Sequence, residues 1–317
     1  KIKTFKDFEM VTPMTRDNYL RQYPLEKMCW DGRIKDKSLV FTATSGSTGK
    51  SFYFPRDKVV DTQSSVFHEN FLRNTFIDGK ELSTLVIDSF GMGVWIGGII
   101  TYQAFRQIAL AGTPVSIITP GVNKKEIFEA FKNIAGRFDQ VILCGYPPFI
   151  KDVIDEGRLH GISWKDFNLK LLFAAEGFSE KFRDYLIKKT GIKNPFLDTA
   201  NIYGSADLGT MAAESPLAIL IRRIACGREK VFSSVFPGVN KTPTLAEFNP
   251  LFVNFEAPEG VILCTGYNIL PLIRYSIGDH GGVVNFNEMK KMLFSAGIDI
   301  MKEAKKAKIE KTINKHM

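Results

Sequence analysis

The sequence has few of the residues that cross-link small secreted domains or hold structural zinc. Its four cysteines, Cys29, Cys144, Cys226 and Cys264, are far apart in the chain and form no C-x-x-C pair. This spacing argues against both a zinc site and a disulfide framework. Residues 1–8 have no signal-peptide pattern. We therefore expect a reducing, cytoplasmic location.

Long apolar runs are also lacking. The most apolar stretch, from Gly91 to Ile118, is interrupted by Gln103, Arg106 and Gln107. No run therefore reaches the roughly 18 apolar residues that a membrane span needs, and we expect none. The chain begins with Lys1 instead of Met, so we expect it to be an incomplete copy of the natural product.

Positive charge is concentrated at one end of the chain. The 317 residues carry a formal charge of +8, and residues 286–317 contain eight lysines against four acidic residues. A lysine-rich amphipathic segment can bind an acidic membrane or nucleic acid. A solvated helix face is the commoner role, so we predict no nucleic-acid partner. The 44% hydrophobic composition, with 26 phenylalanines, is enough to bury a substantial core.

Strand and helix patterns alternate between residues 38 and 214. Short β-branched and aromatic segments predict strands at Ser38–Thr42, Ser51–Phe54, Ser83–Asp88, Val115–Ile118, Gln140–Cys144 and Leu169–Ala174. Amphipathic segments predict helices at Lys58–Phe76, from the glycine-rich turn to Ala111, and at Lys124–Gly136, Pro148–Gly157 and Glu180–Lys189. The alternation is typical of an α/β fold with a layered, mostly parallel sheet and flanking helices.

The segments outside this core have other patterns. Residues 1–37 are an irregular lead-in with a short helix predicted at Asp17–Gln22. Residues 215–285 predict a smaller β-rich subdomain whose strands include Lys230–Phe236, Leu251–Phe255 and Val261–Cys264. Residues 286–317 predict a lysine-rich helical tail broken near Gly297, or the start of a further domain.

A loop rich in glycine and hydroxyl groups joins the first two predicted strands. It runs from Thr44 to Lys50 with the sequence T-S-G-S-T-G-K, and such backbone N–H groups and hydroxyls can surround phosphate oxygens. The G-x-x-x-x-G-K-[ST] motif of P-loop NTPases is an alternative interpretation of this loop, because residues 49–51 match the end of that motif. However, Thr44 stands where its first glycine would be, and a strand follows where a Walker loop opens a helix. A plain linker is the remaining alternative.

Four further motifs follow this loop in order. They are F-G-M-G-V-W-I-G-G at Phe90–Gly98, A-A-E-G at Ala174–Gly177, Y-G-S-A-D at Tyr203–Asp207 and R-Y-S-I-G-D at Arg274–Asp279. The ordered set resembles the adenylate-forming superfamily of acyl-CoA synthetases, and in particular its phenylacetate-CoA ligase-like proteins. The family's counterparts are Ser/Thr-Ser-Gly-Thr-Thr-Gly, a glycine-rich turn, Gly-Ala-Glu-Pro, Tyr-Gly-x-Thr/Ser-Glu and Arg-Tyr-x-Thr-Gly-Asp. The resemblance implies the large N-terminal domain of these enzymes.

The resemblance also implies a reaction. The chain would activate a carboxylic acid with ATP to give acyl-AMP and pyrophosphate and then transfer the acyl group to CoA, with residues 38–214 as the ATP-binding core. The site must neutralise charge on both reactants. By resemblance the β- and γ-phosphates are held by Thr44, Ser45, Gly46, Ser47, Thr48, Gly49 and Lys50. Asp207, where the family has Glu, is the predicted Mg²⁺ ligand, and Arg274 is a further predicted catalytic residue.

The other predicted site residues bind the nucleoside or the acid. The resemblance implies that Tyr203 packs on adenine and that Asp279 accepts hydrogen bonds from the ribose hydroxyls. The rest of the predicted nucleotide site consists of Ala175, Glu176, Gly177, Gly204 and Ser205. The acid pocket is assigned to Trp95, Gly97 and Tyr146, and an aromatic or fatty acid would suit the Phe-rich composition.

Each of these residues has a structural alternative when it is judged singly. Tyr203 could be a core aromatic, and Asp207 and Asp279 could be turn or cap residues. Lys50 could be a solvated lysine, and Arg274 could pair with a structural carboxylate instead of phosphate. The order of the motifs, and no single member, favours the functional interpretation.

Several features depart from the family. Ala206 and Ile277 stand where the family has Thr or Ser, which removes two hydroxyls, and Asp207 is one methylene shorter than Glu. The family continues with a hinge and a small C-terminal domain, whereas this chain has a lysine-rich helical pattern after Gly282. We expect the small domain to be missing from this copy or from this branch. If the branch lacks it, adenylation would be slow and CoA transfer doubtful.

Two other functions stay open. An acyl-protein synthetase, similar to the bioluminescence acyl ligases, would transfer the acyl group to a cysteine, and the sequence does not identify that cysteine among the four. A non-catalytic nucleotide-binding protein would keep the fold without turnover. The sequence sets no oligomeric state, and a homodimer is compatible with it. The expected small-molecule partners are ATP, Mg²⁺, CoA and a carboxylic acid.

Overall fold

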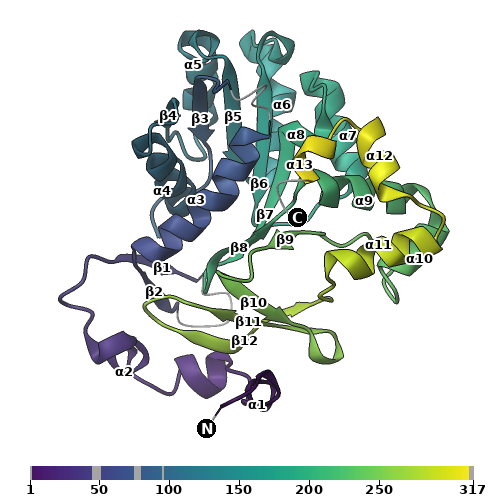
Figure 1. Ribbon diagram of the computed structural model, residues 1–317. Helices are drawn as coiled ribbons and strands as arrows, with labels where there is room; N and C mark the ends of the chain where they lie inside the picture. Colours follow the sequence, from purple (N-terminus) through teal and green to yellow (C-terminus); the bar gives the residue numbers. More distant parts are fainter. Residues whose placement is uncertain (1, 45–50, 75–79, 95, 314–317) are drawn as a thin grey trace.

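The structure is a computed structural model that describes residues 2–44, 51–74, 80–94 and 96–313 (Figure 1). The largest sheet in this part of the chain has seven strands in the order β4-β3-β5-β6-β7-β8-β9. Strands β3 to β7 pair in parallel, and β8 and β9 add antiparallel pairs at one edge. The strands are β3 (Thr84–Asp88), β4 (Val115–Ile118), β5 (Gln140–Gly145), β6 (Leu169–Ala174), β7 (Thr199–Ser205), β8 (Gly209–Ala213) and β9 (Glu247–Phe248). The predicted mostly parallel α/β sheet is confirmed.

Alternate side chains of this sheet pack into two separate cores. On one face Leu85, Leu143 and Phe173 pack against α5, α6 and α7. On the other face Val86 and Ile142 pack against α3 and α4. These helices are α3 (Lys58–Arg73), α4 (Ile96–Leu110), α5 (Lys124–Asn133), α6 (Pro147–Gly157) and α7 (Glu180–Thr190). Because helices cover both faces, the parallel strands are mostly apolar on both faces, and this is why the sequence shows them clearly.

Two smaller antiparallel sheets lie below the seven-stranded sheet in Figure 1. One pairs β1 (Val40–Ala43) with β2 (Tyr53–Arg56). The other contains β10 (Val253–Glu256), β11 (Val261–Gly266) and β12 (Leu272–His280). They share a core with β8 and the lead-in that includes Phe54, Met211 and Tyr275. The strands predicted at 251–255 and 261–264 are confirmed as β10 and β11, within two residues.

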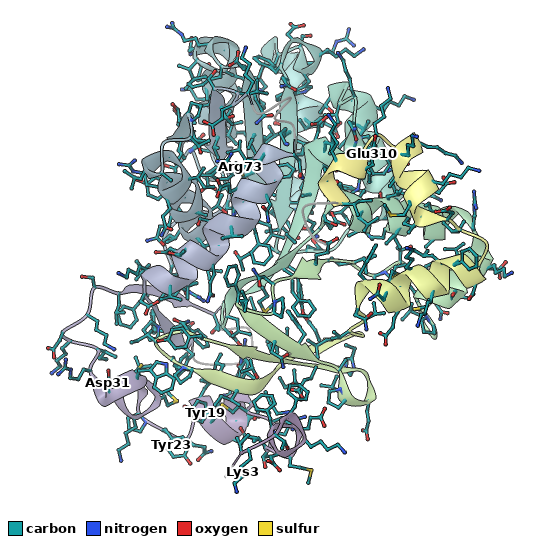
Figure 2. The ribbon with its side chains drawn as sticks, in the orientation of Figure 1. Lys3, Tyr19, Tyr23, Asp31, Arg73 and Glu310 are labelled. Carbon is teal, nitrogen blue, oxygen red and sulfur yellow. The ribbon has the colours of Figure 1, made fainter. Side chains whose placement is uncertain are left out.

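The lead-in is attached to the outer edge of β12. It contains α1 (Phe5–Glu9), a π-helix at Arg16–Leu20 and α2 (Leu25–Met28). The Met14 N–H donates to the Arg274 carbonyl at 3.1 Å, and the Ser276 N–H donates to the Met14 carbonyl at 2.9 Å. Figure 2 shows the lead-in side chains Lys3, Tyr19 and Tyr23 on the side of this sheet away from the large sheet. The lead-in is therefore part of the folded body.

The segment predicted as strand at Lys230–Phe236 is a helix, so that prediction is wrong. The structure has α8 (Pro195–Asp198), α9 (Pro216–Gly227) and α10 (Glu229–Val235). In α10 the buried side chains Val231 and Val235 are four residues apart, which places them on one helical face against α9. The β-structure of the 215–285 region therefore begins only after these helices.

The lysine-rich tail packs against these same helices. It forms α11 (Phe286–Ser295), α12 (Ile300–Lys306) and α13 (Glu310–Ile313). Its apolar residues Met289, Leu293 and Ile300 are buried against α9 and α10. Gly297 adopts φ +85° after α11, the left-handed conformation that commonly ends a helix. The predicted helical stretch with a break near Gly297 is confirmed. None of the described helices is long and apolar enough to cross a bilayer.

Candidate active site

The predicted phosphate loop connects the two strands of the β1–β2 hairpin. Thr44 N–H donates to the Phe52 carbonyl, and Phe52 N–H donates to Thr44 Oγ1, each at 3.2 Å. The loop residues Ser45 to Lys50 lie outside the described residues. The predicted strand, loop, strand order is confirmed, and it differs from the helix that follows a Walker loop. Ala43 N–H also donates to the Val94 carbonyl at 3.0 Å, so the hairpin meets the glycine-rich turn.

Tight packing in the glycine-rich turn explains one of its glycines. A Cβ on Gly98 would lie 2.5 Å from Met92 Sδ and 2.8 Å from the Gly91 carbonyl oxygen, so this position needs glycine. A Cβ on Gly97 would lie 3.4 Å from the Phe90 ring, an ordinary contact. Gly97, predicted for the acid pocket, lies on the first turn of α4. Trp95, the neighbouring prediction for that pocket, lies outside the described residues.

Tyr203 and Asp279, predicted to bind adenine and ribose, are in direct contact. Tyr203 Oη donates to Asp279 Oδ2 at 2.5 Å, across 76 residues of sequence. Burial, the hydrogen bond and the negative charge of Asp279 together raise the pKa of Tyr203. The Tyr203 ring also stacks near Phe255, with ring centroids 6.3 Å apart. The structure therefore brings two separate motifs together between the large sheet and the three-stranded sheet.

The predicted base segment, Ala174–Gly177, follows strand β6. Ala175 adopts φ +77°, a conformation that is strained for a residue with a Cβ. A hydrogen bond to Glu176, with burial and charge as smaller causes, raises the pKa of Tyr146. Tyr146, predicted for the acid pocket, follows β5 and is 41% exposed. Tyr146 and Glu176 thus lie at the carboxyl ends of the neighbouring parallel strands β5 and β6, where ligands bind in open α/β sheets.

Gly204 and Ser205 are the last residues of β7, directly before the turn that leads to β8. A Cβ on Gly204 would lie 2.6 Å from the Gly209 carbonyl oxygen, so a side chain there would displace backbone. Ser205 Oγ accepts a hydrogen bond from Leu208 N–H at 3.1 Å. These contacts shape the turn beside Tyr203, and the predicted nucleotide contacts of both residues stay predictions.

Asp207 is surrounded by hydrogen-bond donors. Arg16 Nη2 donates to both of its carboxylate oxygens at 3.2 and 3.3 Å, and Tyr275 Oη donates to Oδ2 at 2.7 Å. The buried Arg56 guanidinium donates to the neighbouring Ala206 carbonyl. A Mg²⁺ ion needs carboxylate oxygens that are free to bind it, and nearby guanidinium groups would repel it. The hydrogen-bond donors around Asp207 therefore do not fit direct Mg²⁺ binding by its carboxylate. The predicted role of Asp207 as a metal ligand is untested.

Arg274 connects β12 to the lead-in. Its Nε donates to both Glu256 oxygens at 3.1 Å, and its Nη1 donates to the Val11 carbonyl at 2.6 Å and to the Glu9 carbonyl. The side chain is buried. These contacts correspond to the structural alternative, in which Arg274 pairs with a carboxylate, and the predicted catalytic role of Arg274 stays untested.

Asn201 is a candidate nucleotide-site residue that the sequence analysis missed. It precedes Tyr203 by two residues in β7, so both point to the same face of the strand. Asn201 Nδ2 donates to the Glu176 carbonyl at 3.1 Å. Its Oδ1 is buried and has no hydrogen-bond partner among the described residues. The period-2 spacing to Tyr203 is the signal that would have identified it.

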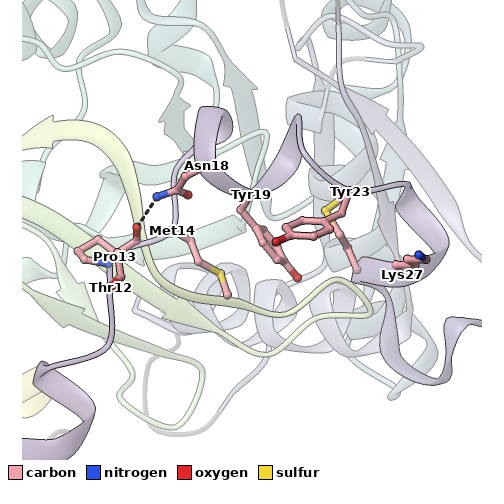
Figure 3. A pocket seen from close by; sticks show the side chains of 8 residues that line it. Thr12, Pro13, Met14, Asn18, Tyr19, Tyr23 and Lys27 are labelled. Carbon is pink, nitrogen blue, oxygen red and sulfur yellow. Dashed lines mark hydrogen bonds between the residues drawn. The ribbon is translucent and has the colours of Figure 1, made fainter.

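A separate pocket lies on the lead-in (Figure 3). Its volume is about 450 Å³, and its lining includes Met14, Tyr19, Tyr23 and Met28. The two tyrosine rings are 5.8 Å apart. The described lining contains none of the predicted site residues, so this pocket is distinct from the predicted acid pocket.

Comparison with known proteins gives matches at the level of structure. No protein-family model matches the sequence, and no curated protein matches it. An open conformation of 2-hydroxyisobutyryl-CoA ligase, in complex with 2-HIB-AMP and CoA, superposes with a TM-score of 0.58 over 87% of this chain and 60% of that chain, at 13% identity. The chain has the fold of the large domain of adenylate-forming CoA ligases.

Other states of that ligase superpose equally widely. The thioesterification state gives a TM-score of 0.58 at 14% identity and the postadenylation state 0.52 at 13%, each over 87% of this chain and 55% or 54% of the ligase chain. This chain thus spans little more than half the length of these ligases. The predicted fold class is confirmed by this likeness, whereas the phenylacetate-CoA ligase-like branch stays a prediction. Identities this low show the CoA-ligase fold alone.

Proposed function

We propose that this protein is an adenylate-forming ligase that activates a carboxylic acid with ATP and transfers the acyl group to CoA. The observation that carries the proposal is the contact between Tyr203 and Asp279, which joins two predicted nucleotide-binding motifs. The fold of a CoA ligase supports it. The first step forms a bond between a carboxylate oxygen and the α-phosphorus of ATP and breaks the bond to pyrophosphate.

The nucleoside would bind between β7 and β12. Adenine would pack on the half-buried Tyr203 ring beside the base segment, and the unpartnered Asn201 Oδ1 would accept a hydrogen bond from its exocyclic amine. The exposed Asp279 carboxylate would accept hydrogen bonds from the ribose hydroxyls. Since a carboxylate has four acceptor sites, Asp279 can keep its bond from Tyr203 and still hold the ribose.

The phosphates would face the β1–β2 hairpin. Thr44 would begin the loop that holds the β- and γ-phosphates, together with Lys50 as a cation for the leaving pyrophosphate. The family uses Mg²⁺ to neutralise these phosphates. Because Arg16 and Tyr275 occupy the Asp207 carboxylate, we assign Asp207 the role of holding the β7–β8 turn.

The acid would bind at the carboxyl ends of β3 and β5, near Gly97 and Tyr146. The Tyr146 ring is partly exposed at the start of α6 and would form one wall of the pocket. We propose aromatic or fatty acids, by the resemblance to phenylacetate-CoA ligases. The acyl-AMP would then be attacked by the CoA thiol, releasing AMP.

A second candidate, an acyl-protein synthetase, depends on an accessible thiol. Cys226 is exposed, whereas Cys29, Cys144 and Cys264 are buried. Burial raises the pKa of the Cys264 thiol to about 12 and that of Cys144 well above its usual value, which disfavours the reactive thiolate. Cys226 is therefore the acceptor that this candidate would use. Acyl label that survives denaturation, is released by hydroxylamine and is lost in Cys226→Ser would support it.

The test is ATP–pyrophosphate exchange with and without a panel of aryl and fatty acids. We expect exchange that requires an added acid and is reduced about 10- to 100-fold in Asp279→Ala. ATP binding without exchange in the full-length protein would contradict the ligase proposal and would favour a non-catalytic nucleotide-binding protein. The replacement of two family hydroxyls by Ala206 and Ile277 is the observation that favours this alternative.

A further inference from the structure

A buried group of four charged side chains lies behind the predicted base segment. It consists of Glu180 and Arg183 of α7, Glu214 after β8, and Arg222 of α9, all less than one-tenth exposed. Arg183 donates to both carboxylates at 2.8 to 3.3 Å, and Arg222 Nη1 donates to Glu180 at 2.8 Å and to Glu214 at 2.9 Å. The two positive and two negative charges balance, as burial of ions requires.

Glu214 connects this group to the base segment and to Phe178 directly after it. Its Oε2 accepts a hydrogen bond from Asn201 N–H at 3.0 Å, and Asn201 Nδ2 donates to the Glu176 carbonyl at 3.1 Å. Its Oε1 accepts from Arg222 Nη1 at 2.9 Å, and Arg222 Nη2 donates to the Phe178 carbonyl. One carboxylate therefore holds the Asn201 backbone and the Arg222 guanidinium, and the side chains of these two residues bond to the Glu176 and Phe178 carbonyls.

The same group also fixes the surroundings of the segment. Arg222 Nε donates to the Pro243 carbonyl at 2.8 Å, and a Cβ on Gly177 would lie 3.0 Å from Thr244 Oγ1. The Arg183 guanidinium lies 4.9 Å from the centre of the Phe178 ring. Because the φ of Ala175 is positive, its conformation persists only while neighbouring contacts hold it. The charged group contributes to these contacts through the Arg222 bond to the Phe178 carbonyl and through the Glu214 bond to the Asn201 backbone.

We propose that Glu214 is a positioning residue for recognition of the nucleotide base. It acts through Asn201 and Arg222, which hold the segment around Glu176 at the distance that a bound adenine requires. This inference rests on the proposed nucleotide function. Among the described residues, the contacts of Glu214 lead to the base segment, and none of them leads to the β1–β2 hairpin. Loss of Glu214 should therefore weaken base discrimination more than phosphate binding.

The test compares ATP and GTP binding by titration calorimetry in the wild type and in Glu214→Gln. The amide keeps the size of the side chain but removes its charge and one acceptor. We expect the ratio of ATP affinity to GTP affinity to fall about tenfold, the effect of one hydrogen bond of base recognition. A purely structural role would lower the affinity for both nucleotides equally, and that result would overturn the inference.

A second variant and a matched control keep the test decisive. Arg222→Lys keeps the positive charge but loses the bonds to the Phe178 and Pro243 carbonyls, so the ratio should fall here as well, even if Glu214→Gln fails to fold. Asp155→Asn is the control, because Asp155 binds Lys151 at 2.8 Å and Tyr185 at 2.5 Å without contacting the base segment. Its ratio should match the wild type.

The possible failures are distinguishable. A wild-type protein that binds neither nucleotide would refute the proposed function itself. A wild-type protein that prefers ATP, with an unchanged preference in both Glu214→Gln and Arg222→Lys, would refute only the positioning role.

Discussion

The buried carboxyl group of Asp88 should make the stability of this protein fall as pH rises. Asp88 ends strand β3 and is fully buried. Its Oδ1 accepts a hydrogen bond from Phe90 N–H at 3.2 Å, and its Oδ2 has no hydrogen-bond partner in the described part of the chain. Burial raises its pKa to about 8. The group is thus protonated in the folded protein at neutral pH and ionised in the unfolded chain.

The expected size follows from this difference in protonation. Between the unfolded pKa of about 4 and the folded pKa of about 8, the folded state binds one more proton than the unfolded state. The free energy of unfolding therefore falls by about 1.4 kcal/mol per pH unit in this range. Asp88→Asn removes this titration and keeps Oδ1 as an acceptor for Phe90. The free energy of unfolding of the variant, minus that of the wild type, should increase by about 3 kcal/mol from pH 5 to pH 7.

Urea unfolding at pH 5, 6 and 7 measures this difference. Because all other groups titrate in both proteins, subtracting the two curves isolates Asp88. The surface variant Asp36→Asn is the control, since Asp36 is exposed and lies in the lead-in. If the wild type and Asp88→Asn gave parallel stability profiles over this range, the buried, protonated state of Asp88 would be wrong.

Three further predictions follow from the site and its supports. Asp279→Ala should reduce acid-dependent ATP–pyrophosphate exchange about 10- to 100-fold, because it removes the charged acceptor proposed for the ribose. Tyr203→Phe leaves the carboxylate in place and should reduce the exchange rate less. Equal rates in wild type and Asp279→Ala would contradict the ribose assignment. Gly98→Ala should lower the free energy of unfolding, measured in urea, by about 1–3 kcal/mol, because its Cβ would lie 2.8 Å from the Gly91 carbonyl oxygen. Gly97→Ala, with its nearest contact at 3.4 Å, should lower the free energy of unfolding less. A larger loss of stability in Gly97→Ala than in Gly98→Ala would refute the packing argument. Burial lowers the pKa of Lys170 to about 7 from 10.5, so between these pH values the unfolded state binds more protons and the free energy of unfolding should rise with pH. Lys170→Met should flatten that rise, measured by urea unfolding at pH 7 to 9. An unchanged dependence of the free energy of unfolding on pH would count against the neutral form of Lys170.

The parallel core could be predicted from the sequence because its strands β3, β5 and β6 are buried on both faces. Segments such as Thr84–Asp88 and Leu169–Ala174 are therefore mostly apolar, with Asp88 and Lys170 as exceptions, and amphipathic helices separate them. Helix α9 gave no such signal. Its residues 216–221 are all buried, so the helical period is hidden, and α10 is only seven residues long.

Side-chain partners across long sequence distances explain what was missed in the site. The Tyr203–Asp279 contact was implied only by motif order, since spacing alone does not pair residues 76 apart. Nothing in the pattern of the lead-in indicated that Arg16 would reach Asp207, 191 residues away. Arg274 was assigned from its motif, and its pairing with Glu256 became visible only once β10 and β12 were placed in one sheet.

The central claim is that the protein forms acyl-AMP, and oxygen transfer tests it most directly. The full-length protein would be incubated with ATP, Mg²⁺, CoA and acids labelled with ¹⁸O in the carboxyl group, and the AMP product would be analysed by mass spectrometry. Since the carboxylate oxygen attacks the α-phosphorus, the account predicts AMP that carries one ¹⁸O atom. AMP without label, or ADP in its place, would contradict it.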